Sequence, residues 1–374
     1  MNRQDADHPD TDSTTWRETP FLMLKGFLMG SADIVPGVSG GTMALITGVY
    51  ERLINAIKSV DGKAISSLLL FRLRQVFLRV HWRFFLILFS GIILAVIFFT
   101  RVVPLQVYMF THPELVYGLF FGLIVGSVVL LVLEVPSRER SLSGLIPILL
   151  GTATGLLIVN LVPADTPNTF FYVFGSGALA ICAMVLPGIS GAYILLILRK
   201  YDYILTQLGN LTSVEAFDAF LNLIPFGLGA LAGLALFTRF LSWVLRKYHT
   251  PTILVLVGFL IGSLAVIWPF QEREYEERVR SVEFYPYTDP LVQSLLERDD
   301  IPTARVYQRI GSIQNPNASF DELKTAEVET VSLRMVQASP RLPDREEGDR
   351  PAHGYAGMAG GLLLIGLIYY LRNR

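Results

Sequence analysis

The feature that most constrains this chain is the recurrence of apolar, nearly uncharged runs long enough to cross a lipid bilayer. A spanning helix needs about 20 consecutive, mostly apolar residues. Such runs predict six spanning helices, at residues 84–103, 115–135, 144–162, 219–245, 252–270 and 354–371. Only 17% of the residues are charged, whereas a soluble domain carries about 25%. The sequence therefore predicts an all-α integral membrane protein and excludes an ordinary soluble enzyme.

The polar residues are concentrated in two places. An N-terminal tail at 1–19 is rich in aspartate, and the segment 271–350 contains 17 acidic and 11 basic residues. That segment is too polar to enter a bilayer and has no decisive helical or strand periodicity over its full length. We expect an acidic extramembrane insertion at 271–350.

Residues that could hold a metal or perform acid–base chemistry are scattered. Cys182 is the only cysteine, and the five histidines are far apart without the spacing of metal ligands. Walker and HExxH patterns are absent, and no paired carboxylates flank the motifs described below. We therefore expect that the protein is not an enzyme, holds no cofactor and binds no nucleic acid. The sequence leaves its oligomeric state undetermined.

Two long apolar stretches, 20–50 and 166–198, are interrupted by proline, glycine and serine. They resemble each other, because PGVSGG at 36–41 aligns with PGISGA at 187–192 at an offset of 151 residues. A second pair, GLIVGS at 122–127 and GFLIGS at 258–263, follows in the same order. These matches predict an internal duplication, with membrane repeats at 20–135 and 166–270.

Each repeat is expected to contain a broken re-entrant hairpin, an amphipathic segment and two spans, with span 144–162 joining the repeats. The amphipathic segment 51–83 carries seven Lys or Arg residues and is therefore expected in the cytoplasm. Three spans then separate the hairpins, which enter from opposite sides and make the repeat inverted. In this arrangement segment 271–350 lies outside the cytoplasm. Arg199 and Lys200 are the weakest point of the arrangement, because these two basic residues also fall on the outer side.

The interruptions suggest a way to bind an anion inside the membrane. Pro36 and Pro187 stop the preceding helices, so that new helices begin near Ser39 and Ser190 with free backbone N–H groups. Such helix starts carry partial positive charge and suit a phosphate. The alternative is that these proline-glycine turns only bend packed helices, with glycine permitting close contact.

Two charged residues near the apolar core have more than one interpretation. Asp33 can carry a coupling proton, pair with a cation such as Lys25, or lie in water at the interface, and Met184 replaces it in the second repeat. Arg239 can hold phosphate from within a spanning region or extend to the cytoplasmic surface with Arg246.

The run KGFLMGSADIVPGVSGGTMALITGVYERLINAI at 25–57, with VLPGISGAYILLIL at 185–198, resembles the bacterial polyprenyl-phosphate transporter family. The resemblance implies a multi-pass protein of the bacterial cytoplasmic membrane that flips undecaprenyl phosphate, the C55 lipid carrier, for reuse in cell-envelope synthesis. It implies membrane lipids and the polyprenyl phosphate as partners. The motif positions are Asp33, Pro36, Gly37, Ser39, Gly40, Gly41 and Thr42, with Pro187, Gly188, Ser190 and Gly191.

Other functions remain open from the residues alone. Paired broken helices also bind small ions, so an ion channel or an ion-coupled solute transporter is the main alternative. A lipid phosphatase would need a nucleophile, base or metal cluster near the hairpins, which the sequence does not offer. A scaffold that uses 271–350 to bind partners would lose its function when that segment is deleted.

Overall fold

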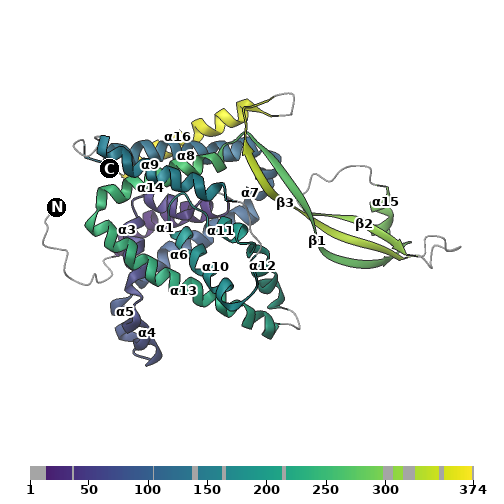
Figure 1. Ribbon diagram of the computed structural model, residues 1–374, viewed down its shortest axis with the longest axis horizontal. Helices are drawn as coiled ribbons and strands as arrows, with labels where there is room; N and C mark the ends of the chain where they lie inside the picture. The colour runs from purple at the N-terminus through teal and green to yellow at the C-terminus, as the bar shows by residue number, and fades with distance from the viewer. Residues whose placement is uncertain are drawn as a thin grey trace. The chain divides into compact units, whose positions relative to one another are not determined.

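The computed structural model describes residues 14–35, 38–103, 105–136, 142–161, 166–212, 216–297, 306–314, 325–344 and 349–372. The chain divides into two compact units (Figure 1). Residues up to 269, together with 344–374, form a helical unit, and residues 270–343 form a smaller unit that contains a β-sheet.

The helical unit is built from helices that follow one another with short connections. Its elements are η1 (Trp16–Glu18), α1 (Thr19–Asp33), α2 (Gly40–Ile46), α3 (Tyr50–Ser59), α4 (Gly62–Leu69), α5 (Leu73–Arg79), α6 (Trp82–Ile97) with η2 (Phe98–Val102), α7 (Leu105–Thr111), α8 (Pro113–Glu134), α9 (Leu142–Val159), α10 (Phe170–Val185), α11 (Gly191–Ile197), α12 (Tyr201–Asn210), α13 (Ala216–Lys247), α14 (His249–Ile267) and α16 (Pro351–Arg372).

Within the described residues, five helices are long and apolar enough to cross a membrane: α6 with η2, α8, α13, α14 and α16. Five of the six predicted spans are thus candidate membrane-spanning helices by length and composition. The remaining predicted span, 144–162, corresponds to α9, whose described apolar part ends at Val159 and is too short. Asn160 ends this helix, and its amide Nδ2 donates a hydrogen bond to Leu156 O.

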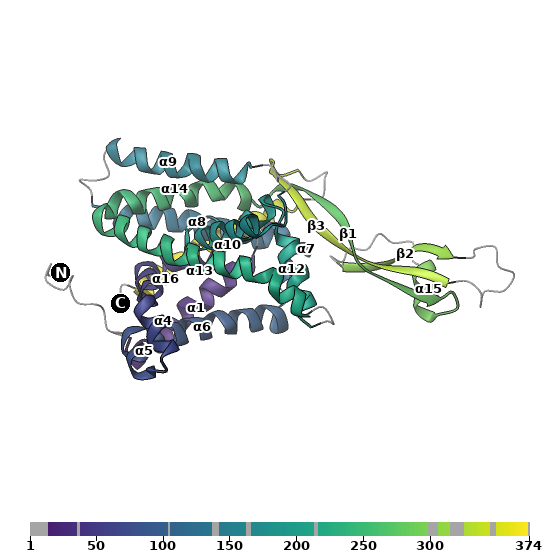
Figure 2. The same cartoon turned by 60° about the horizontal axis from the view of Figure 1, so that its bottom comes forward.

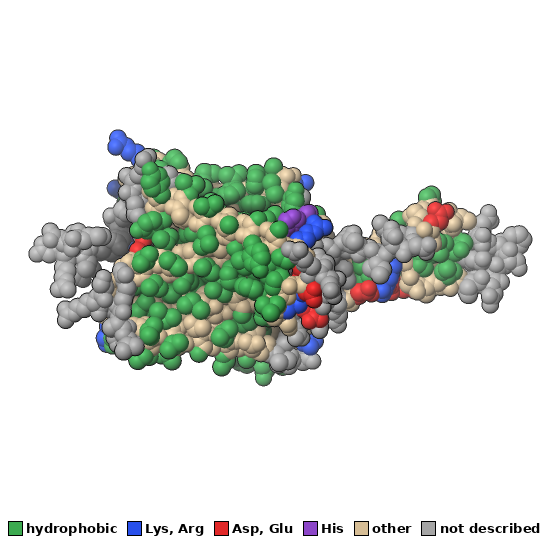
Figure 3. Space-filling view, turned by 90° about the horizontal axis from the view of Figure 1, so that it is seen from above, with side chains coloured by type: hydrophobic (Ala, Val, Ile, Leu, Met, Phe, Trp, Pro, Cys, Tyr) green, Lys and Arg blue, Asp and Glu red, His purple; other side chains and the backbone are tan. Residues whose placement is uncertain are grey.

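The outer surface of the helical unit suits a bilayer. Figure 3 shows a broad apolar surface over these helices, with charged side chains gathered toward its two ends. Large side chains such as Leu236 and Leu363 are more than two-thirds exposed on the spanning helices. In water this much exposed apolar surface would be costly, whereas lipid accepts it. The chain is a membrane protein.

Helix pairs in this unit approach closely through glycine. Gly26 on α1 faces Leu88 O of α6, and Gly177 on α10 faces Phe226 O of α13, each within the space that a Cβ atom would need. Gly122 of α8 meets Met358 of α16 in the same manner. Small residues at a helix interface let backbones approach, which is how helices pack in lipid without a hydrophobic driving force.

The two proline-interrupted segments have matching helix boundaries at the 151-residue offset. Helices α2 and α11 start and end at corresponding residues, and so do α3 and α12. The turn between them is also alike, because Gly48 and its counterpart Arg199 both have positive φ, 69° and 50°. Glycine adopts this conformation readily, whereas arginine is strained there.

The smaller unit is a three-stranded antiparallel sheet in the order β1–β3–β2, with β1 at Gln271–Pro286, β2 at Val306–Gln314 and β3 at Thr325–Pro340. Helix α15 (Pro290–Leu296) supplies Val292, which packs with Ala326 and Val328 in a small core. On β3 these apolar residues alternate with Glu327 and Glu329. The prediction of an all-α protein is thus wrong for this segment. Its strands alternate apolar and charged residues with a period of two, so they contain no long apolar run that would mark them in the sequence.

Several polar residues of this sheet pair across its strands. Arg309 of β2 bonds to Glu329 of β3 through Nε (2.8 Å) and to Glu277 of β1 through Nη1. The Tyr307 hydroxyl donates to Glu277 Oε1 at 2.6 Å. Hydrogen bonds from Tyr307 and Arg309 hold the pKa of the exposed Glu277 carboxyl below its usual range.

Two glycines on α13 give a matched test of the helix packing. A Cβ atom on Gly229 would collide with Phe174 O of α10, whereas a Cβ on Gly227 meets nothing within 4 Å. We expect Gly229→Ala to lower the free energy of unfolding in detergent by about 1–3 kcal/mol. Gly227→Ala should leave it unchanged or raise it by up to about 1 kcal/mol, since alanine favours helix. Equal stability of the two variants in thermal unfolding would contradict the described α10–α13 contact.

Candidate functional site

The two interrupted segments meet in the interior of the helical unit. Helix α1 ends at Asp33 before α2 begins at Gly40, and α10 ends at Val185 before α11 begins at Gly191. Although their sequences lie about 150 residues apart, the two interruptions exchange hydrogen bonds directly. We call the residues 33–42 and 184–191 the paired breaks.

Three side chains of the first segment bind the backbone of the second. The Tyr50 hydroxyl donates to Val185 O at 3.1 Å, and the Ser39 hydroxyl lies 3.4 Å from Leu186 O and 3.5 Å from Met184 O. In the opposite direction, Gly188 N donates to Thr42 Oγ1 at 2.9 Å. All three side chains are buried. They partner backbone groups that the end of α10 leaves without an intrahelical partner.

The start of α2 is already occupied by the protein's own side chains. Gly40 N donates to Asp33 Oδ1 at 2.6 Å, and Gly41 N donates to Ser39 Oγ at 3.2 Å. The expectation that the first N–H groups of this helix are free is therefore wrong at both positions. The Asp33 carboxylate takes the place that an external anion would take, which is a stable position for it near a helix start.

The start of α11 differs from that of α2. Ser190 is the N-cap residue, with extended backbone, but its side chain makes no capping hydrogen bond. Residue 184, which corresponds to Asp33, is methionine and supplies no carboxylate. The two helix starts therefore have different chemistry despite matching boundaries.

Glycine is required at two places in the second break. Gly188 has a φ of 82°, and a Cβ atom there would lie 2.7 Å from Phe259 O of α14. Gly191 faces Ala180 O of α10 at 2.5 Å from the position of a Cβ atom. Pro187, which precedes Gly188, is buried in the turn. A larger residue at either glycine would push the break away from its neighbours.

The remaining predicted site residues lie elsewhere or outside the description. Pro36 and Gly37 fall outside the described residues. Arg239 lies on an exposed face of α13, where its Nη1 donates to Ala235 O of the same helix at 2.7 Å. None of the hydrogen bonds among the described residues joins Arg239 to the paired breaks. A role in holding phosphate has no structural contact to support it.

Sequence reasoning missed two features of this region. Tyr50 is not among the predicted site residues, yet it is 1% exposed and its hydroxyl bonds to Val185 O of the second break. Lys200 is also 1% exposed, and its Nζ donates to Thr166 O (2.5 Å) and to Asn168 Oδ1 (2.8 Å). Lys200 is therefore held by the connection that precedes α10, and the predicted orientation stays a prediction.

The amphipathic segment also contacts the second half of the chain. Helix α3 packs against α13, and Lys58 Nζ lies 3.4 Å from Ser242 Oγ. Glu51 Oε1 lies 2.8 Å from His249 Nε2 at the start of α14. These two contacts join the first interrupted segment to the spans that follow the second.

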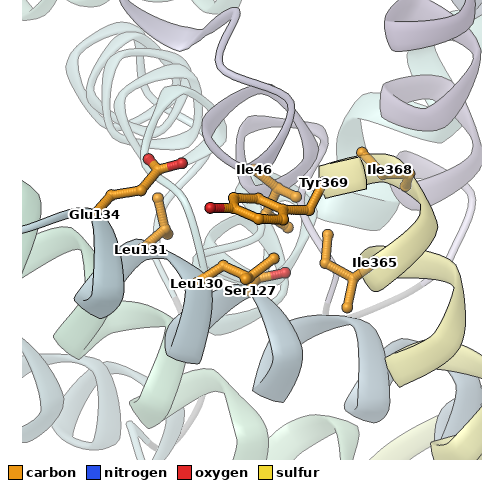
Figure 4. Close-up of a pocket in the computed structure, with 8 residues that line it drawn as sticks. All are labelled: Ile46, Ser127, Leu130, Leu131, Glu134, Ile365, Ile368 and Tyr369. Carbon is orange, nitrogen blue, oxygen red and sulfur yellow. The ribbon is translucent and has the colours of Figure 1, made fainter. Parts of the chain in front are cut away.

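A small cavity lies beside the C-terminal end of α2, between α8 and α16 (Figure 4). Its volume of about 10 Å³ is enough for one water molecule. Ile46, Ser127, Glu134 and Tyr369 are among its lining residues, and Figure 4 shows their side chains gathered around it. The cavity is much too small for a phosphate group.

The model of the VCA0040-like family, described as undecaprenyl phosphate translocase-like, matches residues 29–283. A polyprenyl-phosphate transporter of Vibrio cholerae serotype O1 is 37% identical over 249 residues, which cover 67% of this chain and 77% of the relative. A polyprenyl-phosphate transporter of Staphylococcus aureus is 28% identical over 258 residues, covering 66% of this chain and 85% of the relative. No solved structure matches the chain.

The bond between Thr42 and Gly188 can be tested with two conservative changes. Thr42→Val keeps the shape of the side chain but leaves the buried Gly188 N–H without an acceptor. We expect a loss of about 1–3 kcal/mol in the free energy of unfolding. Thr42→Ser keeps the hydroxyl and should lose less. Equal stability of the valine and serine variants in detergent would show that this hydrogen bond does not hold the breaks together.

Proposed function

The chain belongs to the VCA0040-like, undecaprenyl phosphate translocase-like family, and from this premise we propose that it moves undecaprenyl phosphate across the bacterial cytoplasmic membrane. Its relatives are named transporters rather than enzymes. In this proposal the lipid crosses from the outer to the inner leaflet, where it is reused for cell-envelope synthesis.

The observation that carries the proposal is the meeting of two interrupted helices inside an apolar unit. A phosphate must cross about 30 Å of hydrocarbon, where an unpartnered charge is prohibitively costly. Irregular backbone at that depth occurs where protein or a polar cavity covers it. The paired breaks bring hydroxyl and backbone N–H groups to such a place. The prenyl tail can stay in lipid, so only the head needs a path.

We infer an inverted repeat of two re-entrant hairpins, α1–α2 and α10–α11. The matching boundaries at the 151-residue offset support this inference, and so does the equivalent glycine packing of α1 on α6 and α10 on α13. The basic segment around α3–α5 puts its end of the unit in the cytoplasm. The sheet unit at 270–343 then lies outside.

Within this frame, the phosphate binds first at the second break. Ser190 has no capping bond and Met184 carries no charge, so neither residue supplies a negative group at the start of α11. At the first break, the Asp33 carboxylate accepts from Gly40 N, and a phosphate must displace it before it can bind there. The hydroxyls of Ser39 and Thr42 complete the set of donors between the breaks.

Access alternates when one half of the unit rocks against the other. In the described conformation, α3 is packed on α13 through Lys58 and Ser242, and Glu51 contacts His249. We assign these contacts to a latch that closes the cytoplasmic side. The latch must open for the phosphate to leave inward.

The function is tested by reconstitution with labelled undecaprenyl phosphate, whose exposure on each leaflet is followed with time. We expect the native protein to speed exchange between leaflets, and a rate equal to that of protein-free vesicles would overturn the proposed function. The double variant Ser39→Ala with Ser190→Ala should slow exchange roughly tenfold or more, because each hydroxyl bonded to a charged group contributes about 1.5–3 kcal/mol.

The matched control for this pair is Ser31→Ala with Ser176→Ala. These hydroxyls lie in α1 and α10 but bond to carbonyls of their own helices, Phe27 O and Val173 O. The control should exchange lipid at the native rate. If the Ser39 and Ser190 variant also kept the native rate, the lipid would cross without contacting the paired breaks.

The latch is tested by chemical cross-linking. Lys58→Cys and Ser242→Cys, in a background with Cys182→Ala, place two thiols at a contact that we expect to open and close. A short bis-maleimide linker should stop exchange between leaflets, while the unlinked double variant should retain most of it. Full exchange after quantitative linking would show that α3 and α13 do not separate during transport.

A further inference from the structure

Helices α4 and α5 form a small hairpin that projects from the rest of the helical unit. Both ribbon views show it away from the bundle (Figures 1 and 2). Its base is closed by Arg79 Nη1, which lies 3.1 Å from Asp61 Oδ2, and Asp61 Oδ1 caps α4 by accepting from Ala64 N at 2.8 Å. The hairpin is therefore a defined element with its own hydrogen bonds.

The tip of this hairpin exposes large apolar side chains. Phe71 is 86% exposed and has a φ of 54°, a conformation that phenylalanine adopts only under constraint. Leu70 and Leu73 on either side are also more than half exposed, and Phe77 and Leu78 continue the apolar surface along α5. Such a cluster on a projecting element marks an interaction site.

The same hairpin is strongly basic. Residues 61–83 contain five Lys or Arg residues and one acidic residue, Asp61, which is paired with Arg79. Lys63, Arg72 and Arg74 are exposed, and two of them flank the apolar tip. The partner of this surface must accept apolar side chains and carry negative charge.

The chain itself holds the hairpin close to the bilayer. Helix α5 ends at Arg79, and the spanning helix α6 begins at Trp82. Three residues reach at most about 11 Å. The ring of Trp82 packs edge-on against Phe77 at 5.6 Å. The Arg83 guanidinium lies 5.9 Å from the ring centre of Trp16 and 5.4 Å from that of Trp82. Tryptophan and arginine side chains typically occupy the headgroup region at the end of a span.

We propose that the α4–α5 hairpin is an anchor that inserts its apolar tip into an anionic lipid surface. Leu70, Phe71 and Leu73 enter the boundary between headgroups and acyl chains, while Arg72 and Arg74 bind lipid phosphates. Amphipathic elements with this combination of residues bind membranes more strongly as the buried apolar area and the electrostatic attraction to anionic lipids increase. The anchor holds α3, which precedes it, and α6, which follows it, at a set depth.

The test uses a fluorescent probe at the tip of the full-length protein. Phe71→Cys in the Cys182→Ala background carries a single thiol for an NBD label, and the protein is reconstituted in phosphatidylcholine with or without phosphatidylglycerol. We expect blue-shifted emission and quenching by doxyl-labelled lipid in the anionic vesicles. Adding Arg72→Gln with Arg74→Gln should lower the insertion equilibrium roughly 30-fold.

Two controls separate this proposal from a general effect of charge or label. Arg246→Gln with Lys247→Gln removes the same charge from the end of α13 and should leave the probe at 71 inserted. A label at Ser281→Cys, exposed on β1, should stay in water in both vesicle types. Water-like emission at 71 in anionic vesicles would overturn the anchor. Equal insertion with and without anionic lipid, unchanged by the Arg72 and Arg74 variants, would overturn its preference for anionic lipid.

Discussion

Backbone polar groups cannot remain unpaired where water is scarce, and this constraint governs the arrangement of the paired breaks. An interrupted helix exposes N–H and C=O groups that a continuous helix would satisfy. Here side chains of the first segment satisfy the second break, because Tyr50 and Ser39 bond to carbonyls at the end of α10 and Thr42 accepts from Gly188 N. The first N–H groups of α2 bond instead to Asp33 and Ser39 of their own segment. Two irregular segments are thus tolerated inside an apolar unit because they are placed together.

Glycine provides the close packing that this placement needs. Pairs α1–α6 and α10–α13 bring glycine against backbone carbonyls, so the helices that carry the breaks lie directly against spanning helices. Lipid supplies no hydrophobic force to press helices together, and close contact replaces it.

The differences between the two halves are as informative as their likeness. Asp33 occupies the start of α2, whereas Met184 leaves the start of α11 without a carboxylate. Gly48 makes its turn without strain, whereas Arg199 makes the same turn at a cost, beside the buried Lys200. Two halves with identical chemistry would hold an anion equally well. In the proposed function, the unequal halves would give the phosphate a preferred site and a direction in which to be displaced.

The membrane class, most helix positions and the two motif segments could be predicted from the sequence, because apolar run length and a repeated PGxSG pattern are properties of the chain alone. Strands at 271–340 were missed because alternation with charged residues leaves no apolar run. The contacts of Asp33 with Gly40 and of Tyr50 with Val185 depended on tertiary structure. Those partners are set by how the helices pack. The sequence shows where a helix is interrupted, but it does not reveal which side chain reaches the backbone groups at the interruption in the folded protein.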